Sequence, residues 1–320
     1  MSYLSLSNRV STSTGVGQAR VAIVIPAFNE ALTIAKVVHD FRSVLPAARL
    51  VVVDNASTDG TGRLAEEAGA EVVRETRQGK GFALLAGLRY AAPADIFVMV
   101  DGDGTYPAAS APALIGRIQD GADMVIGTRL QRATEGAFPI GHSWGNRAFI
   151  GIVRLLFGIK TLDLFSGYRA MSRRLLEQSP LIARGFEIET ELSIQAYVNR
   201  FRVEEVPVVY TARTGDSRSK LNTIGDGSRI AIAILSFFRD YRPLMAFGWT
   251  ALLLFAASIA AGSLVIEQYL ATGQVLRIPL AIGAVGLFIL SALSLTAGVL
   301  LSSINRRTEE LRSMLASRWG

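Results

Sequence analysis

Two aspartates two residues apart are the first candidates for chemistry in this chain. Asp101 and Asp103 stand in the sequence Asp-Gly-Asp-Gly-Thr, directly after an apolar run over residues 95–100. The glycines let both carboxylates turn toward one divalent cation. Carboxylate oxygens favour Mg²⁺ or Mn²⁺, and these ions commonly bind substrate phosphates as well. A simple Asp-Gly turn is the alternative, but the position at the end of an apolar run favours a cation site.

Two earlier polar clusters follow apolar runs in the same way. They are the sequences Pro26-Ala27-Phe28-Asn29-Glu30 and Asp54-Asn55-Ala56-Ser57-Thr58-Asp59-Gly60. A carboxylate at the end of a strand can accept hydrogen bonds from a nucleobase or a ribose. Loop and helix-capping chemistry is the alternative for each cluster. Taken singly, each cluster leaves the choice open.

The elements that must position these clusters are predicted from hydrophobic patterns. Predicted strands alternate with predicted helices: the strands are residues 20–26, 50–54, 71–74, 95–100 and 123–127, and the helices are residues 30–45, 58–68 and 79–92. Strands separated by helices of about 10–15 residues indicate a parallel α/β sheet. Ligands of such sheets bind beyond the carboxyl ends of the strands. The polar clusters fall at those ends, which predicts one binding site there.

The last third of the chain holds two long apolar segments, residues 244–266 and 278–304, and neither carries a charge. At ~1.5 Å per helical residue, each can span a hydrocarbon core of ~30 Å. Only residues 267–277 separate them, so we expect a transmembrane helical hairpin. Two buried helices of a soluble domain are the alternative. The length, the spacing and the flanking arginines favour the hairpin.

Basic residues flank the hairpin on one side. Arg239 and Arg242 precede it, Arg306 and Arg307 follow it, and the connecting segment contains a single basic residue, Arg277. Cytoplasmic loops carry the excess of Lys and Arg in membrane proteins. We therefore expect a multi-pass protein of the cytoplasmic membrane, with both termini and the α/β domain in the cytosol.

Three further segments complete the expected organisation. Residues 1–19, rich in Ser, Thr and Gly, are expected to form a flexible tail, and residues 305–320 a cytosolic tail. Residues 223–243 alternate charged and apolar side chains, which predicts an amphipathic helix at the membrane interface. A core helix packed under the sheet is the alternative for this last segment.

Composition narrows the chemistry further. The chain has no cysteine and two histidines, which excludes a disulfide framework, an iron–sulfur cluster, a cysteine nucleophile and a multi-histidine metal site. A hydrophobic fraction of 50% excludes a disordered chain. A net charge of +6 fits an anionic membrane surface or a phosphate-bearing substrate better than a nucleic-acid groove.

Taken together, the three clusters and several later motifs resemble family 2 glycosyltransferases, and more narrowly the branch of dolichol-phosphate mannose synthase and bacterial polyprenyl-phosphate sugar transferases. The likeness runs over about residues 21–221. The later motifs are Gly79-Lys80-Gly81, Gly127-Thr128-Arg129, Asp163, Ser166-Gly167-Tyr168-Arg169, Phe186-Glu187-Ile188-Glu189-Thr190-Glu191 and Ser219-Lys220-Leu221. The resemblance implies a GT-A catalytic domain over residues 20–222, with a Rossmann-like, mostly parallel sheet, followed by a C-terminal two-helix transmembrane hairpin.

The resemblance also implies roles for individual residues. A nucleotide-sugar donor is expected to contact Pro26, Ala27, Asn29, Glu30, Asp54, Asn55, Lys80 and Asp101. Asp101 and Asp103 are expected to hold Mg²⁺ or Mn²⁺ on the diphosphate, and Arg129 to contact a phosphate. Some relatives have a glutamine ligand two residues after the second aspartate, where this chain has Thr105. Water is therefore expected to complete the coordination of the metal.

A surplus of basic residues suggests that the acceptor carries a phosphate. Residues 142–184 contain seven basic and two acidic side chains, and arginine binds phosphate bidentately. A solvated basic face is the alternative. For the acceptor phosphate we expect contacts from Arg147, Ser166, Arg169, Arg213 and Lys220.

A phosphate acceptor changes what catalysis requires. A phosphate monoester has a second pKa of about 6, so it is largely dianionic at neutral pH and needs no strong base. A hydroxyl acceptor does need a base. Glu189 and Glu191 are candidates for catalytic residues that orient the site, with a general effect of negative charge at a helix N-terminus as the alternative.

These observations lead to one expected reaction and two alternatives. We expect inverting transfer of one sugar from UDP-hexose or UDP-N-acetylhexosamine, with GDP-mannose as a further option, to undecaprenyl or dolichyl phosphate on the cytosolic leaflet. Transfer to another lipid or to a glycan hydroxyl is the first alternative, and a non-catalytic membrane scaffold is the second. The oligomeric state stays open, with a homo-oligomer among the options.

Overall fold

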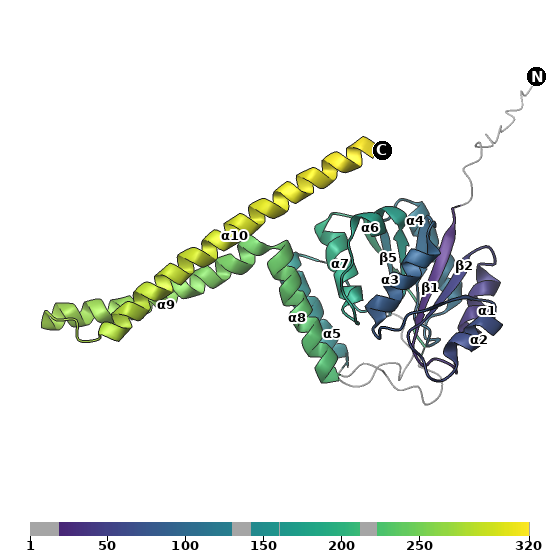
Figure 1. Ribbon diagram of the computed structural model, residues 1–320, viewed down its shortest axis with the longest axis horizontal. Helices are drawn as coiled ribbons and strands as arrows, with labels where there is room; N and C mark the ends of the chain where they lie inside the picture. The colour runs from purple at the N-terminus through teal and green to yellow at the C-terminus, as the bar shows by residue number, and fades with distance from the viewer. Residues whose placement is uncertain (1–18, 130–141, 160, 212–222, 320) are drawn as a thin grey trace, which may run out of the picture.

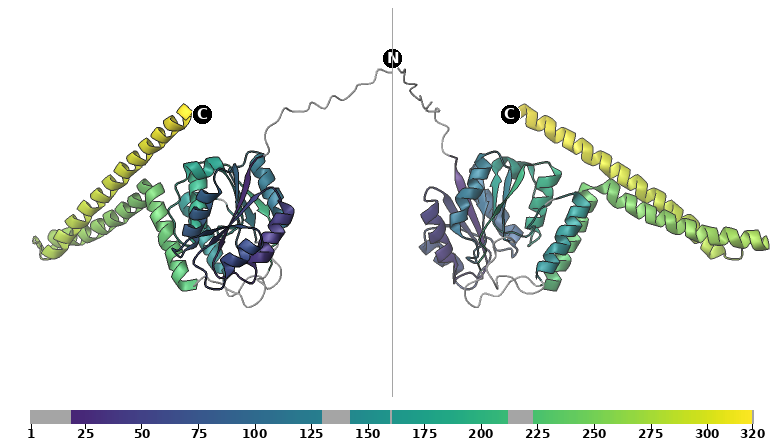
Figure 2. Two further views of the ribbon diagram at one scale, coloured as in Figure 1. Left: turned by 45° about the vertical axis from the view of Figure 1, so that its right-hand side comes forward. Right: turned by 180° about the vertical axis from the view of Figure 1, so that it is seen from behind.

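The computed structural model of the 320-residue chain describes residues 19–129, 142–159, 161–211 and 223–319. It contains an α/β domain, two helices packed on the side of that domain, and a long helical hairpin that projects away from it (Figures 1 and 2). The expected N-terminal tail, apart from residue 19, lies outside the described residues.

The α/β domain is built on a seven-stranded sheet with the strand order β3-β2-β1-β4-β6-β5-β7. The strands are β1 (Val21–Ala27), β2 (Arg49–Asp54), β3 (Glu71–Arg74), β4 (Ile96–Met99), β5 (Met124–Thr128), β6 (Arg169–Ser172) and β7 (Val203–Pro207). Neighbouring strands run parallel except at β6, which is antiparallel to both β4 and β5. The mostly parallel sheet is therefore confirmed, and the five predicted strands lie within one residue of observed ones.

Helices cover both faces of this sheet (Figure 1). One face carries α1 (Ile34–Val44), α2 (Thr61–Glu67), a 3₁₀ turn η1 (Ala108–Ser110) and α4 (Ala111–Gln119), and the other carries α3 (Lys80–Ala91), α6 (Arg173–Gln178) and α7 (Ile188–Val198). Successive strand side chains point to opposite faces, so Ile23 joins the first core and Val24 the second. Burial on both faces explains why the strands read as continuous apolar runs.

Helices α5 (His142–Phe157) and α8 (Thr223–Tyr241) form a further layer beside α7 (Figure 1). Their shared core includes Val153, Phe157, Ile194, Ile230, Ile234 and Phe237. On α8, Ile232 and Leu235 are instead 64% and 61% exposed. Helix α8 therefore packs on the α/β domain with one face and presents apolar side chains outward on the other, and its place at a membrane interface stays a prediction.

The chain continues into a hairpin of α9 (Pro243–Thr272) and α10 (Ile278–Trp319). Both helices are long and apolar enough to cross a membrane, with mean hydropathies of 2.0 and 2.3 in their apolar stretches. The hydroxyls of Ser258, Ser291 and Ser294 donate to carbonyls of the opposite helix at 2.8, 2.8 and 2.9 Å.

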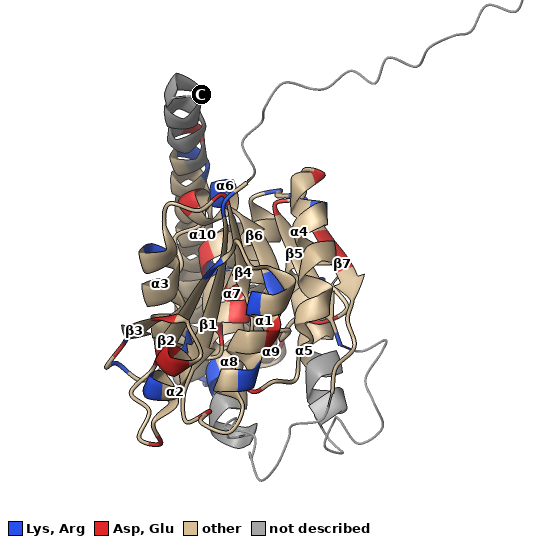
Figure 3. Cartoon of the chain, turned by 90° about the vertical axis from the view of Figure 1, so that its right-hand side faces the viewer, with Lys and Arg blue, Asp and Glu red and all other residues tan. Residues whose placement is uncertain are grey.

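Helix α10 does not end where the apolar segment ends. It continues to Trp319, so residues 305–319 of the expected cytosolic tail are helical. Basic and acidic residues reappear on this part of α10 (Figure 3).

Candidate active site

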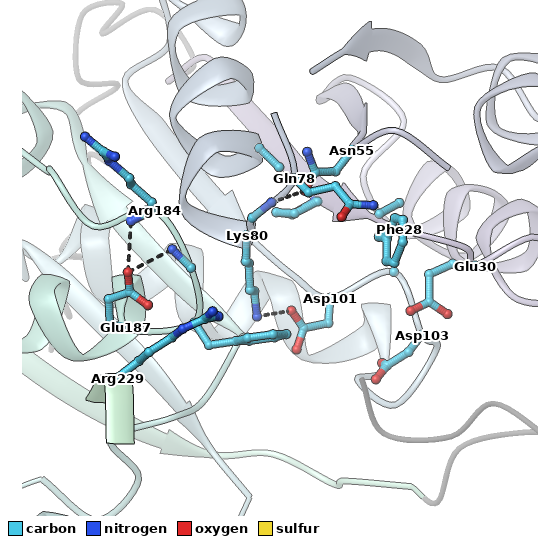
Figure 4. A pocket seen from close by; sticks show the side chains of 17 residues that line it. Phe28, Glu30, Asn55, Gln78, Lys80, Asp101, Asp103, Arg184, Glu187 and Arg229 are labelled. Carbon is cyan, nitrogen blue, oxygen red and sulfur yellow. Dashed lines mark hydrogen bonds and ion pairs between the residues drawn. The ribbon is translucent and has the colours of Figure 1, made fainter. Parts of the chain in front are cut away.

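A cleft of about 570 Å³ opens at the carboxyl ends of β1, β2 and β4, at the sheet edge that the sequence indicated. The loops after these strands form one side of it. The N-terminus of α3, the segment before α7, and α8 contribute the rest (Figure 4). The cleft therefore brings together side chains from positions as far apart as Pro26 and Arg229.

Asp101 and Asp103 follow β4 and both line the cleft. One carboxylate oxygen of Asp103 accepts hydrogen bonds from the backbone N–H of Thr105 at 3.1 Å and from its hydroxyl at 2.6 Å. Thr105 thus fixes the orientation of Asp103. Gly167 lies so close to Asp101 that a Cβ at this position would overlap the carboxylate. This glycine is needed for a close approach.

Lys80 lies between two carboxylates. Its Nζ atom is 2.5 Å from Oδ1 of Asp101 and 2.5 Å from Oε1 of Glu189. Burial works against the ammonium charge, but the two carboxylates outweigh it and raise the pKa of Lys80 above its ordinary value. Burial also raises the pKa of Glu189, with Lys80 acting against that shift. Lys80 is therefore held charged beside Asp101, and Glu189 positions it.

The carboxylates suit a divalent cation that keeps water or phosphate among its ligands. In the described part of the chain, no three His, Cys, Asp or Glu side chains converge as a complete metal site. Asp101 and Asp103 both contribute hard oxygen donors to the lining of the cleft. Mg²⁺ is commonly bound by one or two carboxylates together with substrate phosphates, so the residues present fit such an ion.

The cleft is also lined by Pro26, Phe28, Glu30, Asn55 and Gln78. The side chain of Asn55 donates to the carbonyls of Glu75 and Arg77 at 3.1 and 2.7 Å, and accepts from the N–H of Gly79 at 2.8 Å. Asn55 therefore holds the loop that presents Gln78. Sequence reasoning missed Gln78, whose only signal is its place directly before the Gly-Lys-Gly motif.

Asn29 and Asp54, which were expected to contact the donor, both accept hydrogen bonds from the neighbouring loop. Asn29 accepts a hydrogen bond from the N–H of Thr58 at 2.8 Å, and Asp54 accepts one from the N–H of Ser57 at 2.9 Å. Neither lines the cleft. Ala27, also expected there, does line it.

Glu191 organises the segment that faces α3. Its carboxylate accepts hydrogen bonds from the N–H groups of Ile182 and Ala183 at 3.0 and 2.8 Å, and from the amide of Gln195 at 3.0 Å. Burial raises its pKa, and these donors act in the opposite direction. Glu191 is thus committed to positioning a loop, in contrast to Glu189, which contacts Lys80.

Replacing Gly81 with alanine should damage both stability and activity. A Cβ there would overlap the backbone carbonyl of Ala183, in the segment that Glu191 holds in place. Overpacking of this kind typically costs about 1–3 kcal/mol, and the shift would displace Lys80. Thermal unfolding of Gly116→Ala is the control, because Gly116 lies in α4 with open space around it. Equal melting temperatures for the two variants would contradict this account.

Arg129 is occupied by an ion pair. Its guanidinium donates to both oxygens of Asp163 at 2.7 and 2.8 Å, and it lies over the ring of Tyr210 at 5.4 Å. Asp163 is fully buried, and Arg129 is not among the residues that line the cleft. The expected contact between Arg129 and a donor phosphate therefore stays a prediction.

Arg169 and Ser166, both assigned to the acceptor phosphate, are completely buried. Arg169 donates to the carbonyls of Ser166 and Leu164 at 2.9 and 2.7 Å and to the hydroxyl of Ser193 at 2.8 Å. Ser166 donates to the carbonyl of Gly127 at 2.5 Å. The polar groups of these two residues are thus used inside the domain, and the structure does not support their expected contact with an acceptor phosphate.

For the other three residues expected at the acceptor, contact with a phosphate stays a prediction. Arg213 and Lys220 lie outside the described residues, and Arg147 is on α5 at a position whose side chain is not described. Arg184, Glu187 and Arg229, in contrast, line the cleft. Arg229 comes from α8, the helix that sequence reasoning placed at the membrane.

The fold and the site define a class of protein: a mostly parallel α/β domain in which an Asp-x-Asp pair faces a cleft at the carboxyl edge. The profile of Glycosyl transferase family 2 matches residues 22–179. The chain is 36% identical over 228 residues to glycosyltransferase AglJ of Haloferax volcanii, covering 71% of this chain and 75% of the relative. A dolichyl-phosphate hexose transferase of the same organism is 30% identical over 69% of this chain and 95% of the relative.

Solved structures of glycosyltransferases are similar to this chain as well. Glucosyl-3-phosphoglycerate synthase from Mycobacterium tuberculosis, in complex with Mn²⁺, uridine diphosphate and glucosyl-3-phosphoglycerate, superposes with a TM-score of 0.55 at 29% identity. The match covers 69% of this chain and 80% of that chain. The chain belongs to glycosyltransferase family 2, it has the GT-A fold, and it is a glycosyltransferase.

Proposed function

We propose that this glycosyltransferase moves a single sugar from a nucleotide-diphosphate sugar to a polyprenyl phosphate at the cytosolic face of a membrane. One observation carries the proposal. The cleft with the paired aspartates is lined by Arg229 of α8, and one residue, Arg242, joins α8 to the first apolar helix. The reaction site is thus physically linked to the segment suited to a lipid.

The donor is proposed to lie along the cleft, with its nucleoside near Phe28, Asn55 and Gln78 and its diphosphate near Asp101 and Asp103. Support comes from the neighbouring structure that holds uridine diphosphate with Mn²⁺, so UDP-hexose or UDP-N-acetylhexosamine is favoured over GDP-mannose. When bound, Mg²⁺ or Mn²⁺ would stabilise the charge of the departing nucleoside diphosphate. Asp101 and Asp103 are the residues that would hold the ion.

Lys80 is proposed to add a second positive charge at the diphosphate. Its side chain is only 11% exposed, and its ammonium group contacts Asp101. A preorganised charge in such a site stabilises a developing negative charge more strongly than it would in water. Glu189 holds Lys80 from the other side at 2.5 Å and so supports this role without touching the donor.

The proposed transfer needs no proton shuttle. An oxygen of the acceptor phosphate forms a bond to the anomeric carbon, the bond from that carbon to the nucleoside diphosphate breaks, and the nucleoside diphosphate leaves with the electron pair. A hydroxyl acceptor would require a general base. Glu189 is paired with Lys80, and Glu191 with backbone N–H groups. These contacts favour a phosphate over a hydroxyl acceptor.

The hairpin of α9 and α10 is proposed to span the membrane, with both ends of the chain in the cytosol. Large apolar side chains such as Leu253, Leu270 and Ile282 are 70%, 78% and 68% exposed. Exposed apolar surface on this scale marks contact with a membrane or a partner. The serine hydrogen bonds across the hairpin would hold its helices together in lipid, where such bonds contribute to helix association.

A donor screen tests this function. Purified full-length protein in detergent, undecaprenyl phosphate and Mg²⁺ or Mn²⁺ are incubated with a panel of nucleotide sugars, and the organic phase is analysed by mass spectrometry. We expect one lipid-phosphate sugar, which disappears when EDTA is added. Absence of a lipid product from every donor, with nucleotide binding still measurable, would contradict the proposed acceptor.

A further inference from the structure

Helix α8 meets the hairpin at a single residue. The helix ends at Tyr241, Pro243 begins α9, and Arg242 between them has the non-helical backbone angles φ −131° and ψ 51°. The segment from Arg229, which lines the cleft, to the end of α8 is helical and, at ~1.5 Å per residue, about 20 Å long. With a lever of this length, a rotation of about 15° at the junction would move the cleft by about 5 Å relative to the hairpin.

Helix α10 passes beside this junction (Figures 1 and 2). At Gly298 its backbone touches the start of α9: a Cβ there would lie 2.9 Å from Cβ of Phe247 and 3.3 Å from the carbonyl oxygen of Pro243. One turn earlier, the hydroxyl of Ser294 donates to the carbonyl of Phe247 at 2.9 Å. Small residues allow membrane helices to approach each other closely, and Gly298 has this function at the base of the hairpin.

The same face of α10 also reaches α8. Ser294, Gly298 and Asn305 are spaced at i, i+4 and i+11, which places them on one face of a helix. The side-chain amide of Asn305 donates to the carbonyl of Asp240, in the last turn of α8, at 2.6 Å. The last carbonyls of a helix lack partners within it, so Asn305 caps α8 and ties α10 to it. Contacts along this face thus continue from the base of the hairpin to the helix that lines the cleft.

We propose that Gly298 and Asn305 are positioning residues. They fix the angle between the α/β domain and the hairpin, and so hold the cleft where an acceptor anchored in a membrane can enter it. This inference rests on the proposed function and on a hairpin that spans the membrane. A misplacement of about 1 Å can lower a rate about 100-fold, and the lever of α8 converts a small change of angle into a larger one. A soluble acceptor reaches the cleft by free diffusion, so only a membrane-anchored acceptor should respond to the angle.

Gly298→Leu tests this inference in the full-length protein, reconstituted in phosphatidylcholine vesicles that contain undecaprenyl phosphate. We expect kcat/KM for this lipid to fall about 10- to 100-fold. The kcat/KM for a soluble short-chain isoprenyl phosphate and the KM for the donor should stay unchanged. Asn305→Ala, which removes the hydrogen bond without overpacking, should show the same selective loss to a smaller extent. Gly286→Leu is the matched control, because it adds the same side chain to α10 where open space surrounds the glycine, and it should leave all three constants unchanged.

A distance measurement reports the angle itself. The chain has no cysteine, so spin labels can be attached through Glu67→Cys at the end of α2 and Gln274→Cys between the helices of the hairpin. Pulsed electron paramagnetic resonance then measures the separation of the two labels in the same vesicles. We expect the distance distribution to shift or broaden in Gly298→Leu, and to match that of the wild type in Gly286→Leu.

Equal losses with the lipid and the soluble acceptor would show general damage to the enzyme and overturn the inference. An unchanged distance distribution in Gly298→Leu, or undiminished transfer to undecaprenyl phosphate by both variants, would also overturn it. If Gly298→Leu does not fold, Asn305→Ala decides by the same criteria. Failure of the wild-type protein to glycosylate undecaprenyl phosphate would instead contradict the proposed function, while the distance measurement would still show whether Gly298 fixes the angle.

Discussion

We expect Asp103→Asn to lower turnover by about 10³-fold, because the change removes one of the two carboxylates proposed to hold the metal on the donor diphosphate. The fold around it should persist. Asparagine keeps a side-chain oxygen that can accept the hydrogen bonds now donated by Thr105. Steady-state kinetics at saturating Mg²⁺ or Mn²⁺, with circular dichroism as a check of folding, measure the effect.

Asp59→Asn provides a matched control. One oxygen of Asp59 accepts from the N–H of Thr61 at 3.0 Å and from its hydroxyl at 2.5 Å, the same pattern that joins Asp103 to Thr105. Asp59, however, does not line the cleft. Its variant should keep near-normal turnover. Equal activity of Asp103→Asn and wild-type protein would contradict the metal site.

The second large effect concerns stability. Arg169→Met should lower the free energy of unfolding by about 1–3 kcal/mol for each buried acceptor that loses its donor. The substitution would leave the carbonyls of Leu164 and Ser166 and the hydroxyl of Ser193 without their donor. The acceptor KM of the folded fraction should not change. Urea unfolding of the full-length protein in detergent, followed by circular dichroism, measures the loss.

Arg174→Met is the control for this change. Arg174 is 65% exposed, and its ion pair with Asp123 is 3.6 Å long. Exposed pairs contribute about 0–1 kcal/mol, so this variant should unfold close to the wild type. A fully stable Arg169→Met protein with a weakened acceptor KM would return Arg169 to the acceptor site and contradict its structural role.

The sheet and its functional edge could be predicted because their signals are local. An apolar strand followed at once by polar residues, as at Asp54 and Asp101, reports both burial and the strand's carboxyl end. Strand β6 (Arg169–Ser172) was not predicted. It is four residues long, it begins with an arginine, and its antiparallel pairing depends on β4 and β5, which are remote in sequence.

The candidate site was predicted only in part, because several of its contacts join residues that are far apart in the sequence. A count of basic residues does not distinguish an arginine that faces solvent from one that is buried against carbonyls, so it could not predict that Arg169 is buried. Arg229 lies in the helix that was predicted over residues 223–243, but the face it occupies depends on how α8 packs on α5 and α7. Lys80 was expected near the donor, whereas its link to Glu189 spans 109 positions and needed the fold.

Acceptor competition tests the central claim most directly. The full-length protein, its nucleotide-sugar donor labelled in the sugar, and a divalent cation are incubated with equal amounts of polyprenyl phosphate, a polyprenyl alcohol and phosphoglyceric acid. We predict that the label enters the organic phase, attached to the polyprenyl phosphate, and that Asp103→Asn abolishes this product. Label found instead on the alcohol, or in the aqueous phase on phosphoglyceric acid, would contradict transfer to a lipid phosphate.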